Sequence, residues 1–120
     1  MDICIKRIYE PPAADDGVRV LVDRIWPRGL KKEAAALDAW RKDVAPSDVL
    51  RRWFGHEPAR WDEFRRRYEA ELEANPEGVC WLLERARQGR LTLCYSARDP
   101  VHNQAVVLRD YLLRKAVAGL

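Results

Sequence analysis

Cysteine is scarce in this sequence, and long apolar runs are missing. The 120 residues contain three cysteines, Cys4, Cys80 and Cys94. A small odd number does not suit a disulfide framework, so we expect a reducing, cytoplasmic environment. No apolar stretch approaches the ~20 residues that a helix needs to cross a bilayer, so no membrane partner is expected. The first residues also lack the apolar core of a signal peptide.

Motifs that hold common cofactors are missing as well. The sequence has no phosphate loop ending in Gly-Lys-Ser/Thr and no Gly-x-Gly-x-x-Gly fingerprint. It also has no Cys-x-x-Cys or His-Glu-x-x-His pattern. We therefore expect no cofactor and no metal ion.

The composition indicates one globular domain over residues 1–120. Hydrophobic residues make up 48% of the chain and charged residues 34%, which is typical of a soluble protein. The 22 basic and 19 acidic residues nearly balance, with a net charge of +3 and a pI of 8.9. Such a small surplus does not favour a nucleic-acid partner, because nucleic-acid-binding proteins usually have a basic face.

The segment 18–29 is the centre of the predicted fold. It reads Val-Arg-Val-Leu-Val-Asp-Arg-Ile-Trp-Pro-Arg-Gly, an apolar run that ends in charged residues and a Pro-Gly turn. This pattern is typical of a buried strand that delivers side chains to a site in an α/β protein. Residues 3–9 and 91–95 predict two further strands. The long helical passage between 18–22 and 91–95 is the crossover that parallel pairing requires, so these two strands are predicted to be neighbours.

Helix caps and apolar periodicity predict the rest of the fold. Four helices are expected, at residues 47–55, 58–74, 75–89 and from Pro100 to about Val117. Residues 30–36 contain good helix formers, and residues 38–44 are compatible with both a helix and a short strand. The predicted fold is α/β: a small, mostly parallel sheet flanked by helices in a three-layer βαβ-type single domain.

The densest basic run, Arg65 to Arg67, lies on the predicted helix 58–74. Opposite charges stand four residues apart on this helix, and each such pair stabilises an exposed helix by ~0.3 kcal/mol. We therefore interpret the run as a neutralised, solvated face and not as a nucleic-acid site. The expected pairs are Asp62–Arg66, Glu63–Arg67, Arg65–Glu69 and Arg67–Glu71.

Polar and charged residues follow both predicted central strands. Parallel strands bring their carboxyl ends to one edge of the sheet, where the last helix also begins with free N–H groups and a partial positive charge. Arginines at such an edge favour a site for an anion, such as a phosphate, a carboxylate or a nucleotide tail. The residues expected there are Asp23, Arg24, Trp26 and Arg28 from one strand, and Ser96, Arg98, His102 and Asn103 from the other.

Two residues at this edge could move protons. His102 titrates near neutrality, and Asp23 is the carboxylate of the site, so both are candidate catalytic residues. His56, in a loop between two helices, has the weaker case. Cys94 is the tempting nucleophile, but Pro100 stands where a phosphatase-like or rhodanese-like loop has its arginine. We interpret Cys94 as a core thiol.

A resemblance covers nearly the whole chain. The most specific block is Val22-Asp23-Arg24-Ile25-Trp26-Pro27-Arg28-Gly29, and the others include Lys6 to Tyr9, Ala45-Pro46-Ser47, Leu93 to Ser96 and His102-Asn103. These residues closely resemble the YeaO-like branch of the domain-of-unknown-function family 488. The resemblance implies a compact α/β domain in a bacterial or archaeal cytoplasm, and it implies no activity. Relatives in the wider family often carry a cysteine before the last helix, and this chain has none between Ser96 and Asn103.

Three hypotheses follow for the function. The leading one is a pocket for a small anionic ligand, in a binding protein or in a hydrolase or transferase. Arg24, Arg28 and Arg98 would hold the anion and Trp26 would wall the pocket. The alternatives are a nucleic-acid-binding module and a scaffold protein whose tryptophans form a homodimer surface.

Overall fold

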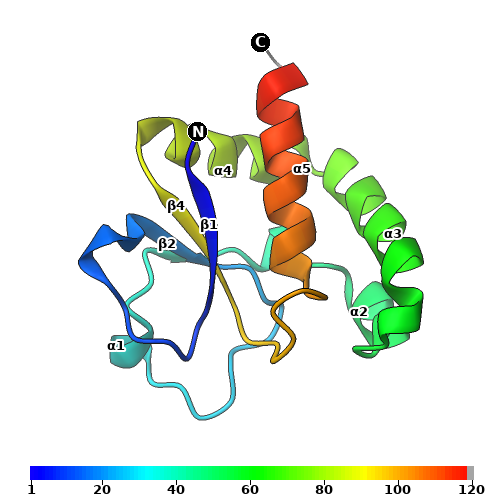
Figure 1. Ribbon diagram of the computed structural model, residues 1–120, viewed down its shortest axis with the longest axis horizontal. Coiled ribbons are helices and arrows are strands. Elements are labelled where there is room, and N and C mark those ends of the chain that lie inside the picture. Colours follow the sequence, from blue (N-terminus) through cyan, green and yellow to red (C-terminus); the bar gives the residue numbers. More distant parts are fainter. Residues whose placement is uncertain (119–120) are drawn as a thin grey trace.

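A four-stranded parallel sheet forms the centre of the protein (Figure 1). The computed structural model describes residues 1–118. The strand order is β1 (Ile3–Arg7), β4 (Leu91–Tyr95), β2 (Val18–Leu21) and β3 (Ala39–Trp40), and every neighbouring pair is parallel. The predicted pairing of the two central strands is confirmed, with Val20 opposite Leu93. The α/β fold class is therefore confirmed.

The helices follow the predicted order, although their bounds differ in places. Those of α geometry are α1 (Lys32–Ala35), α2 (Asp48–Phe54), α3 (Trp61–Glu73), α4 (Pro76–Gln88) and α5 (Gln104–Ala118). Three short 3-10 turns are η1 (Ala14–Asp16), η2 (Lys42–Val44) and η3 (Pro58–Arg60). No helix within residues 1–118 is long and apolar enough to span a membrane.

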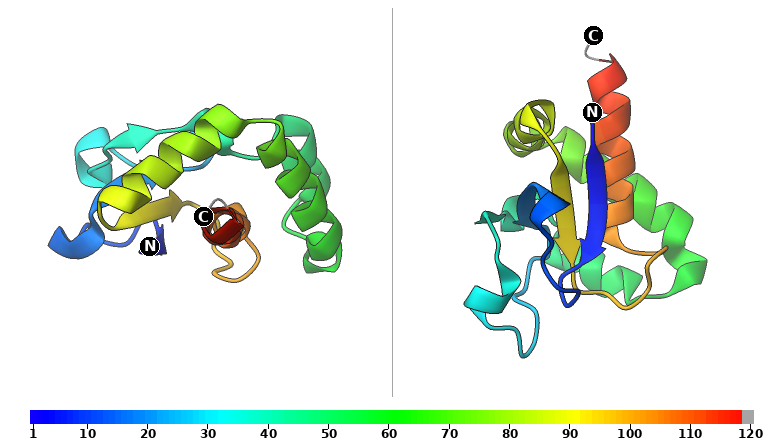
Figure 2. Two further views of the ribbon diagram at one scale, coloured as in Figure 1. Left: turned by 90° about the horizontal axis from the view of Figure 1, so that it is seen from above. Right: turned by 60° about the vertical axis from the view of Figure 1, so that its left-hand side comes forward.

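Alternate side chains of the strands enter two separate cores. The major core contains Val20, Val22, Leu91 and Leu93 and lies against α2 to α5. Helix α5 packs along β1 and β4, α4 crosses β4, and α3 lies on the outer side of α5 (Figures 1 and 2). The minor core, on the opposite face, is a thin layer closed by α1 and the segments around it. It consists of Ile8, Leu21, Ala35 and Cys94, with Trp26, Leu30, Leu37 and Trp40 packed against them.

Side-chain caps fix the starts of α2 and α4 as the sequence predicts. The Ser47 hydroxyl accepts the Leu50 N–H at 3.2 Å, and the Asn75 amide oxygen accepts the Gly78 N–H at 3.1 Å. Gly55 ends α2 in the left-handed region, with φ of 52°. Tyr68 of α3 is fully buried and donates its hydroxyl to the Val44 carbonyl at 2.5 Å. The Tyr68 bond ties α3 to η2, the turn that precedes α2.

Two predicted bounds are wrong, the end of the first strand and the start of the last helix. The first strand stops at Arg7 and not at residue 9, because a turn begins there. The Glu10 carboxylate accepts the Arg7 N–H, and the Glu10 N–H donates to the Arg7 carbonyl. The last helix begins at Gln104 and not directly after Pro100. The Asp99 carboxylate accepts the N–H groups of Val101 and His102, which delays the helix, and the Asn103 side chain then accepts the Val106 N–H at 3.2 Å. The undecided segment 38–44 forms both β3 and η2.

The arginine run of α3 is neutralised, but mostly by partners other than those predicted. Of the expected pairs, Glu63–Arg67 forms at 2.9 Å. Glu63 also pairs with Arg66 one turn away, and Arg65 instead reaches Asp110 of α5 at 3.5 Å. Glu69 pairs with Arg114 of α5. The sequence could not reveal that α5 lies against α3 and supplies these charges.

Candidate functional site

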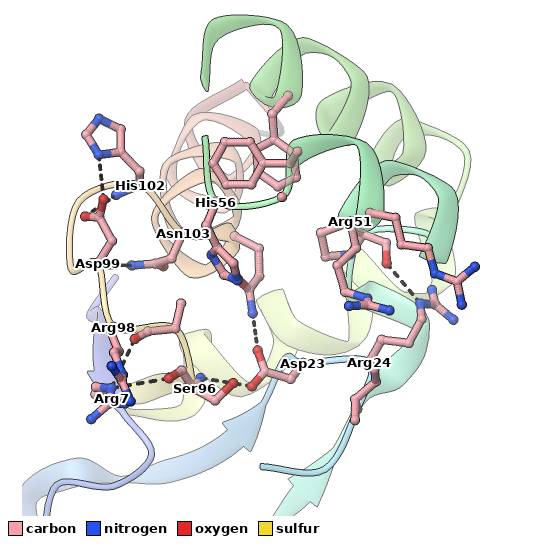
Figure 3. A pocket seen from close by; sticks show the side chains of 18 of the residues that line it. Arg7, Asp23, Arg24, Arg51, His56, Ser96, Arg98, Asp99, His102 and Asn103 are labelled. Carbon is pink, nitrogen blue, oxygen red and sulfur yellow. Dashed lines mark hydrogen bonds and ion pairs between the residues drawn. The ribbon is translucent and has the colours of Figure 1, made fainter. Parts of the chain in front are cut away.

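A large pocket opens at the carboxyl end of the sheet (Figure 3). Its volume is about 1110 Å³, which is enough for a ligand the size of a cofactor or a drug. The lining comes from the ends of β1, β2 and β4, from α2, and from the loop that precedes α5. Six arginines and two aspartates line it, namely Arg7, Arg24, Arg28, Arg51, Arg52, Arg98, Asp23 and Asp99.

Asp23 lies at the centre of the pocket, between arginines on either side (Figure 3). Its Oδ2 accepts the Ser96 N–H at 2.9 Å, and its Oδ1 accepts the Gln104 amide. Trp40 donates to the Asp23 carbonyl at 2.7 Å, which ties the segment after β2 to β3. Burial raises the pKa of the Asp23 carboxyl, and the bonds from Ser96 and Gln104 oppose that shift.

One side of the pocket carries Arg24, Arg51 and Arg52, which we call the helix-side arginines. Arg24 donates from Nε to the Pro46 carbonyl at 2.9 Å and has no carboxylate within 4 Å among the described residues. Arg51 and Arg52 of α2 share one carboxylate, Asp48, at 2.8 and 2.9 Å. These three arginines together lower the pKa of Asp48. Three positive charges thus face one partly exposed carboxylate.

The other side carries Arg7 and Arg98, the strand-side arginines (Figure 3). Arg7 Nε donates to the carbonyls of Ser96 and Ala97 at 3.3 and 3.1 Å, and the guanidinium lies over the Tyr9 ring at 4.7 Å. Arg98 is exposed. Neither arginine forms an ion pair with a carboxylate within residues 1–118. Main-chain carbonyls therefore position Arg7, and the charges of both arginines stay available.

Asp99 and His102 form a pair at the edge of the pocket, away from Asp23 (Figure 3). The His102 Nδ1 lies 2.9 Å from Asp99 Oδ2, and the imidazole meets the edge of the Trp61 ring at 5.2 Å. Bonds from the N–H groups of His102 and Val101 lower the pKa of Asp99 to about 2. Asn103 is buried and donates to the Asp99 carbonyl at 2.9 Å. Asn103 therefore shapes the loop.

His56 brings backbone strain to the pocket wall. It follows left-handed Gly55 and itself has φ of 58°, which is uncommon for a residue with a side chain. Such a conformation costs on the order of 1–3 kcal/mol and is frequent at ligand sites. The centroid of the imidazole lies 6.2 Å from that of the Phe54 ring. Phe54 and Phe64, stacked at 4.3 Å, provide an apolar part of the lining.

The structure brings together all but one of the predicted site residues. Trp26 lies apart from this pocket. It packs edge-on against Trp40 at 5.2 Å in the minor core and donates to the Leu30 carbonyl at 2.7 Å. The tryptophan therefore closes the opposite face of the sheet. The residues that do line the pocket are Asp23, Arg24, Arg28, Ser96, Arg98, His102 and Asn103.

Several lining residues escaped the sequence analysis. Arg7 ends a strand that pairs with β4, and Arg51 and Arg52 lie on a helix that packs beside the strand ends. Gln104, which donates to Asp23, was missed because the sequence analysis placed it inside the last helix. The signal for Arg7 was its place at the end of a third strand. No local signal marks Arg51 or Arg52, because their position depends on how α2 packs.

Cys94 is buried within the minor core, as predicted. Burial raises the pKa of its thiol to about 11, so the reactive thiolate is rare near neutral pH. The described residues contain no cluster of three or more histidine, cysteine or acidic side chains arranged to hold a metal ion.

Comparison with known proteins places the chain in a family. Residues 2–118 match the model described as "Inactive DUF488-N3 subclade". The chain is 45% identical to "Uncharacterized protein YeaO" of Escherichia coli strain K12, over 93% of this chain and 97% of that protein. It is 54% identical to "Uncharacterized protein Rv3073c" of Mycobacterium tuberculosis H37Rv, over 90% of this chain and 91% of that protein. No solved structure matches it. The predicted resemblance is confirmed: the chain belongs to the inactive DUF488-N3 subclade, the YeaO-like branch of domain-of-unknown-function family 488.

Proposed function

We propose that the protein binds a small anionic ligand, phosphorylated or carboxylated, in the pocket at the carboxyl end of the sheet. The single observation that carries the proposal is the state of its arginines. Arg7, Arg24, Arg28 and Arg98 line the pocket, yet none pairs with a carboxylate within residues 1–118. Most arginines outside the pocket, such as Arg19, Arg66 and Arg114, have such a partner. Arg60 and Arg87 have none among the described residues, but neither lines the pocket.

Arginine suits the proposed ligand chemistry. Its planar guanidinium donates two parallel hydrogen bonds to a phosphate or a carboxylate, and these charge-assisted bonds are stronger than neutral ones. The bonds to main-chain carbonyls hold Arg7 and Arg24 in place before any ligand arrives. Prior positioning lowers the entropy that binding must offset.

We propose that the protein binds its ligand without turning it over, in place of the hydrolase or transferase hypothesis that the sequence suggested. The family is described as inactive. The groups that could move protons are also engaged, since both Asp23 oxygens accept bonds from the protein and His102 is paired with Asp99. The proposed setting is a bacterial cytoplasm, in keeping with bacterial relatives and with three free cysteines.

A thermal-shift panel tests the proposal. The panel contains inorganic phosphate, sugar phosphates, nucleotides and dicarboxylates at matched ionic strength. A ligand at 100 times its Kd stabilises the folded state by about 2.7 kcal/mol, so we expect at least one compound to raise Tm by about 8 °C or more. Arg28→Ala should abolish most of that rise, because it removes one of the unpaired charges of the pocket. The variant should still fold, because this exposed side chain forms no ion pair within residues 1–118.

The matched control is Arg66→Ala on α3, which removes the same charge from outside the pocket. It should retain the full rise in Tm. No stabilisation by any compound, or an equal rise in wild type and Arg28→Ala, contradicts the proposal. A larger shift with single-stranded oligonucleotides, weakening steeply with salt, would favour the nucleic-acid alternative.

A further inference from the structure

The pocket carries its positive charge in two separate places. The strand-side arginines, Arg7 and Arg98, lie on one side of Asp23, and Arg24 and Arg51 lie on the other (Figure 3). We infer that the ligand has two anionic groups, one for each side, joined by a neutral hydroxyl-bearing middle that lies over Asp23. This inference rests on the proposed function and specifies its ligand class.

Different parts of the chain build the two sides independently. Carbonyls of Ser96 and Ala97, directly after β4, position Arg7. The carbonyls of Ala45 and Pro46, before α2, position Arg24 at 3.4 and 2.9 Å. Each side therefore has an anchored guanidinium and one more exposed arginine. On the strand side this is Arg98, which has no carboxylate partner among the described residues, and on the helix side it is Arg52, which shares the single carboxylate of Asp48 with Arg51. This is enough to hold an anion on each side.

Asp23 separates the two anion positions electrostatically. Its buried carboxyl lies at the centre, where an ionised form repels any second negative group. A carboxylate offers about four lone-pair positions, and protein donors occupy two of those on Asp23. The remaining positions suit a hydroxyl or an amine of the ligand. The centre of the pocket therefore favours a neutral donor and disfavours an anion.

The size of the pocket agrees with an extended ligand. Pockets of roughly 300–1,000 Å³ hold drug-sized molecules, and this one measures about 1110 Å³. A single phosphate ion would leave most of that volume, and one of the two arginine groups, unused. A polyol or sugar bisphosphate has the required chemistry, with two phosphates and hydroxyl groups between them.

The first test is a titration with inorganic phosphate alone, followed by backbone amide NMR. We expect two sets of shifts, one near Ala97 and Arg98 and one in the first turns of α2. Arg98→Ala should remove only the first set, and Arg52→Ala should weaken only the second. Arg66→Ala is the control and should change neither. A single set of shifts that both pocket variants weaken overturns the two-site inference while the proposed function stands.

The second test compares fructose 1,6-bisphosphate with fructose 6-phosphate by calorimetry at fixed salt. The bisphosphate should bind at least about 10-fold more tightly, because the second phosphate joins an already bound molecule. Either Arg98→Ala or Arg52→Ala should reduce that advantage to about 2-fold or less. Equal affinities for the two compounds contradict a bridging ligand. Tighter binding of a single-stranded oligonucleotide than of the bisphosphate contradicts a small-molecule ligand. No binding of any phosphate compound overturns the bisphosphate inference, and the proposed function itself fails if the dicarboxylates of the thermal-shift panel do not bind either.

Discussion

Arginines in two regions of this molecule have different hydrogen-bond partners. On the outer face of α3 and α5, carboxylates neutralise them, as in the pairs Arg67–Glu63 and Arg114–Glu69. At the carboxyl end of the sheet, Arg7 and Arg24 bond main-chain carbonyls instead. A carbonyl fixes the geometry of a guanidinium without cancelling its charge. In the pocket, positive charge that is positioned but not neutralised is the basis of the proposed anion binding.

Arg19 shows what a purely structural arginine looks like. It is buried, bonds Asp16 at 2.6 Å, and donates to the carbonyls of Ala35 and Ala36 at 2.8 and 3.1 Å. Asp16 also accepts Lys6 at 3.1 Å. Every part of this network is satisfied within the protein, so Arg19 contributes to stability and leaves nothing for a ligand.

The largest effect is therefore expected away from the pocket. Arg19→Ala leaves the buried Asp16 with Lys6 as its one remaining cationic partner and removes three hydrogen bonds. Breaking one side of a buried ion pair typically costs about 3–5 kcal/mol, so we expect a loss of about 3 kcal/mol in urea unfolding. Arg98→Ala should change the free energy of unfolding by less than about 0.5 kcal/mol. Equal losses in the two variants would erase the distinction between structural and binding arginines.

Asp23→Asn should have a smaller effect, and it should strengthen anion binding. The change removes the negative charge at the centre of the pocket and should raise phosphate affinity about 5-fold, which is roughly 1 kcal/mol. Because burial raises the pKa of Asp23, wild type loses stability as pH rises from the unfolded pKa through the folded one. The variant should lack that loss. The two measurements are calorimetry with phosphate and denaturant unfolding between pH 4 and 7, and weaker phosphate binding would contradict the repulsion assigned to Asp23.

Acid titration probes the loop before α5, which carries Arg98. The pKa of Asp99 is lowered to about 2, so its contribution to stability is present above its unfolded pKa near 4 and disappears as pH falls toward 2. Asp99→Asn should show a smaller loss of stability over that interval than wild type does. Unfolding monitored by circular dichroism at pH 2 to 5 checks this. Identical acid profiles would show that the bonds to His102 and Val101 contribute nothing.

The smallest effect is expected on α3. Glu63→Gln deprives Arg66 and Arg67 of their carboxylate. Exposed ion pairs contribute little to stability, so the midpoint of urea unfolding should match that of wild type. The variant should also gain no phosphate binding in calorimetry, since α3 offers free charge without a concave site. Phosphate binding comparable to that of the pocket would show that unpaired arginines alone are sufficient.

The sequence predicts the centre of this fold better than its periphery. Apolar runs and caps such as Ser47 and Asn75 are local features, so the parallel pair β2–β4 and the start of α2 and α4 follow from neighbouring residues. The predicted site at the strand ends rests on the same local features and on parallel pairing. Trp26 was misplaced because the turn after Asp23 carries it to the opposite face, where Trp40 meets it. Arg51 and Arg52 were missed because long-range packing of α2, and no local pattern, brings them to the pocket.

One pair of double variants tests the central claim most directly. Each double variant removes two positive charges. Arg28→Ala/Arg98→Ala removes them from the pocket, and Arg66→Ala/Arg67→Ala removes them from α3. Calorimetric titration with a phosphorylated ligand from the panel should show at least about 100-fold weaker binding for the first variant, since each of the two charged contacts is worth about 1.5 kcal/mol or more. The second variant should bind within about 2-fold of wild type. Equal losses in the two variants would mean that net charge, and not the pocket, attracts the anion.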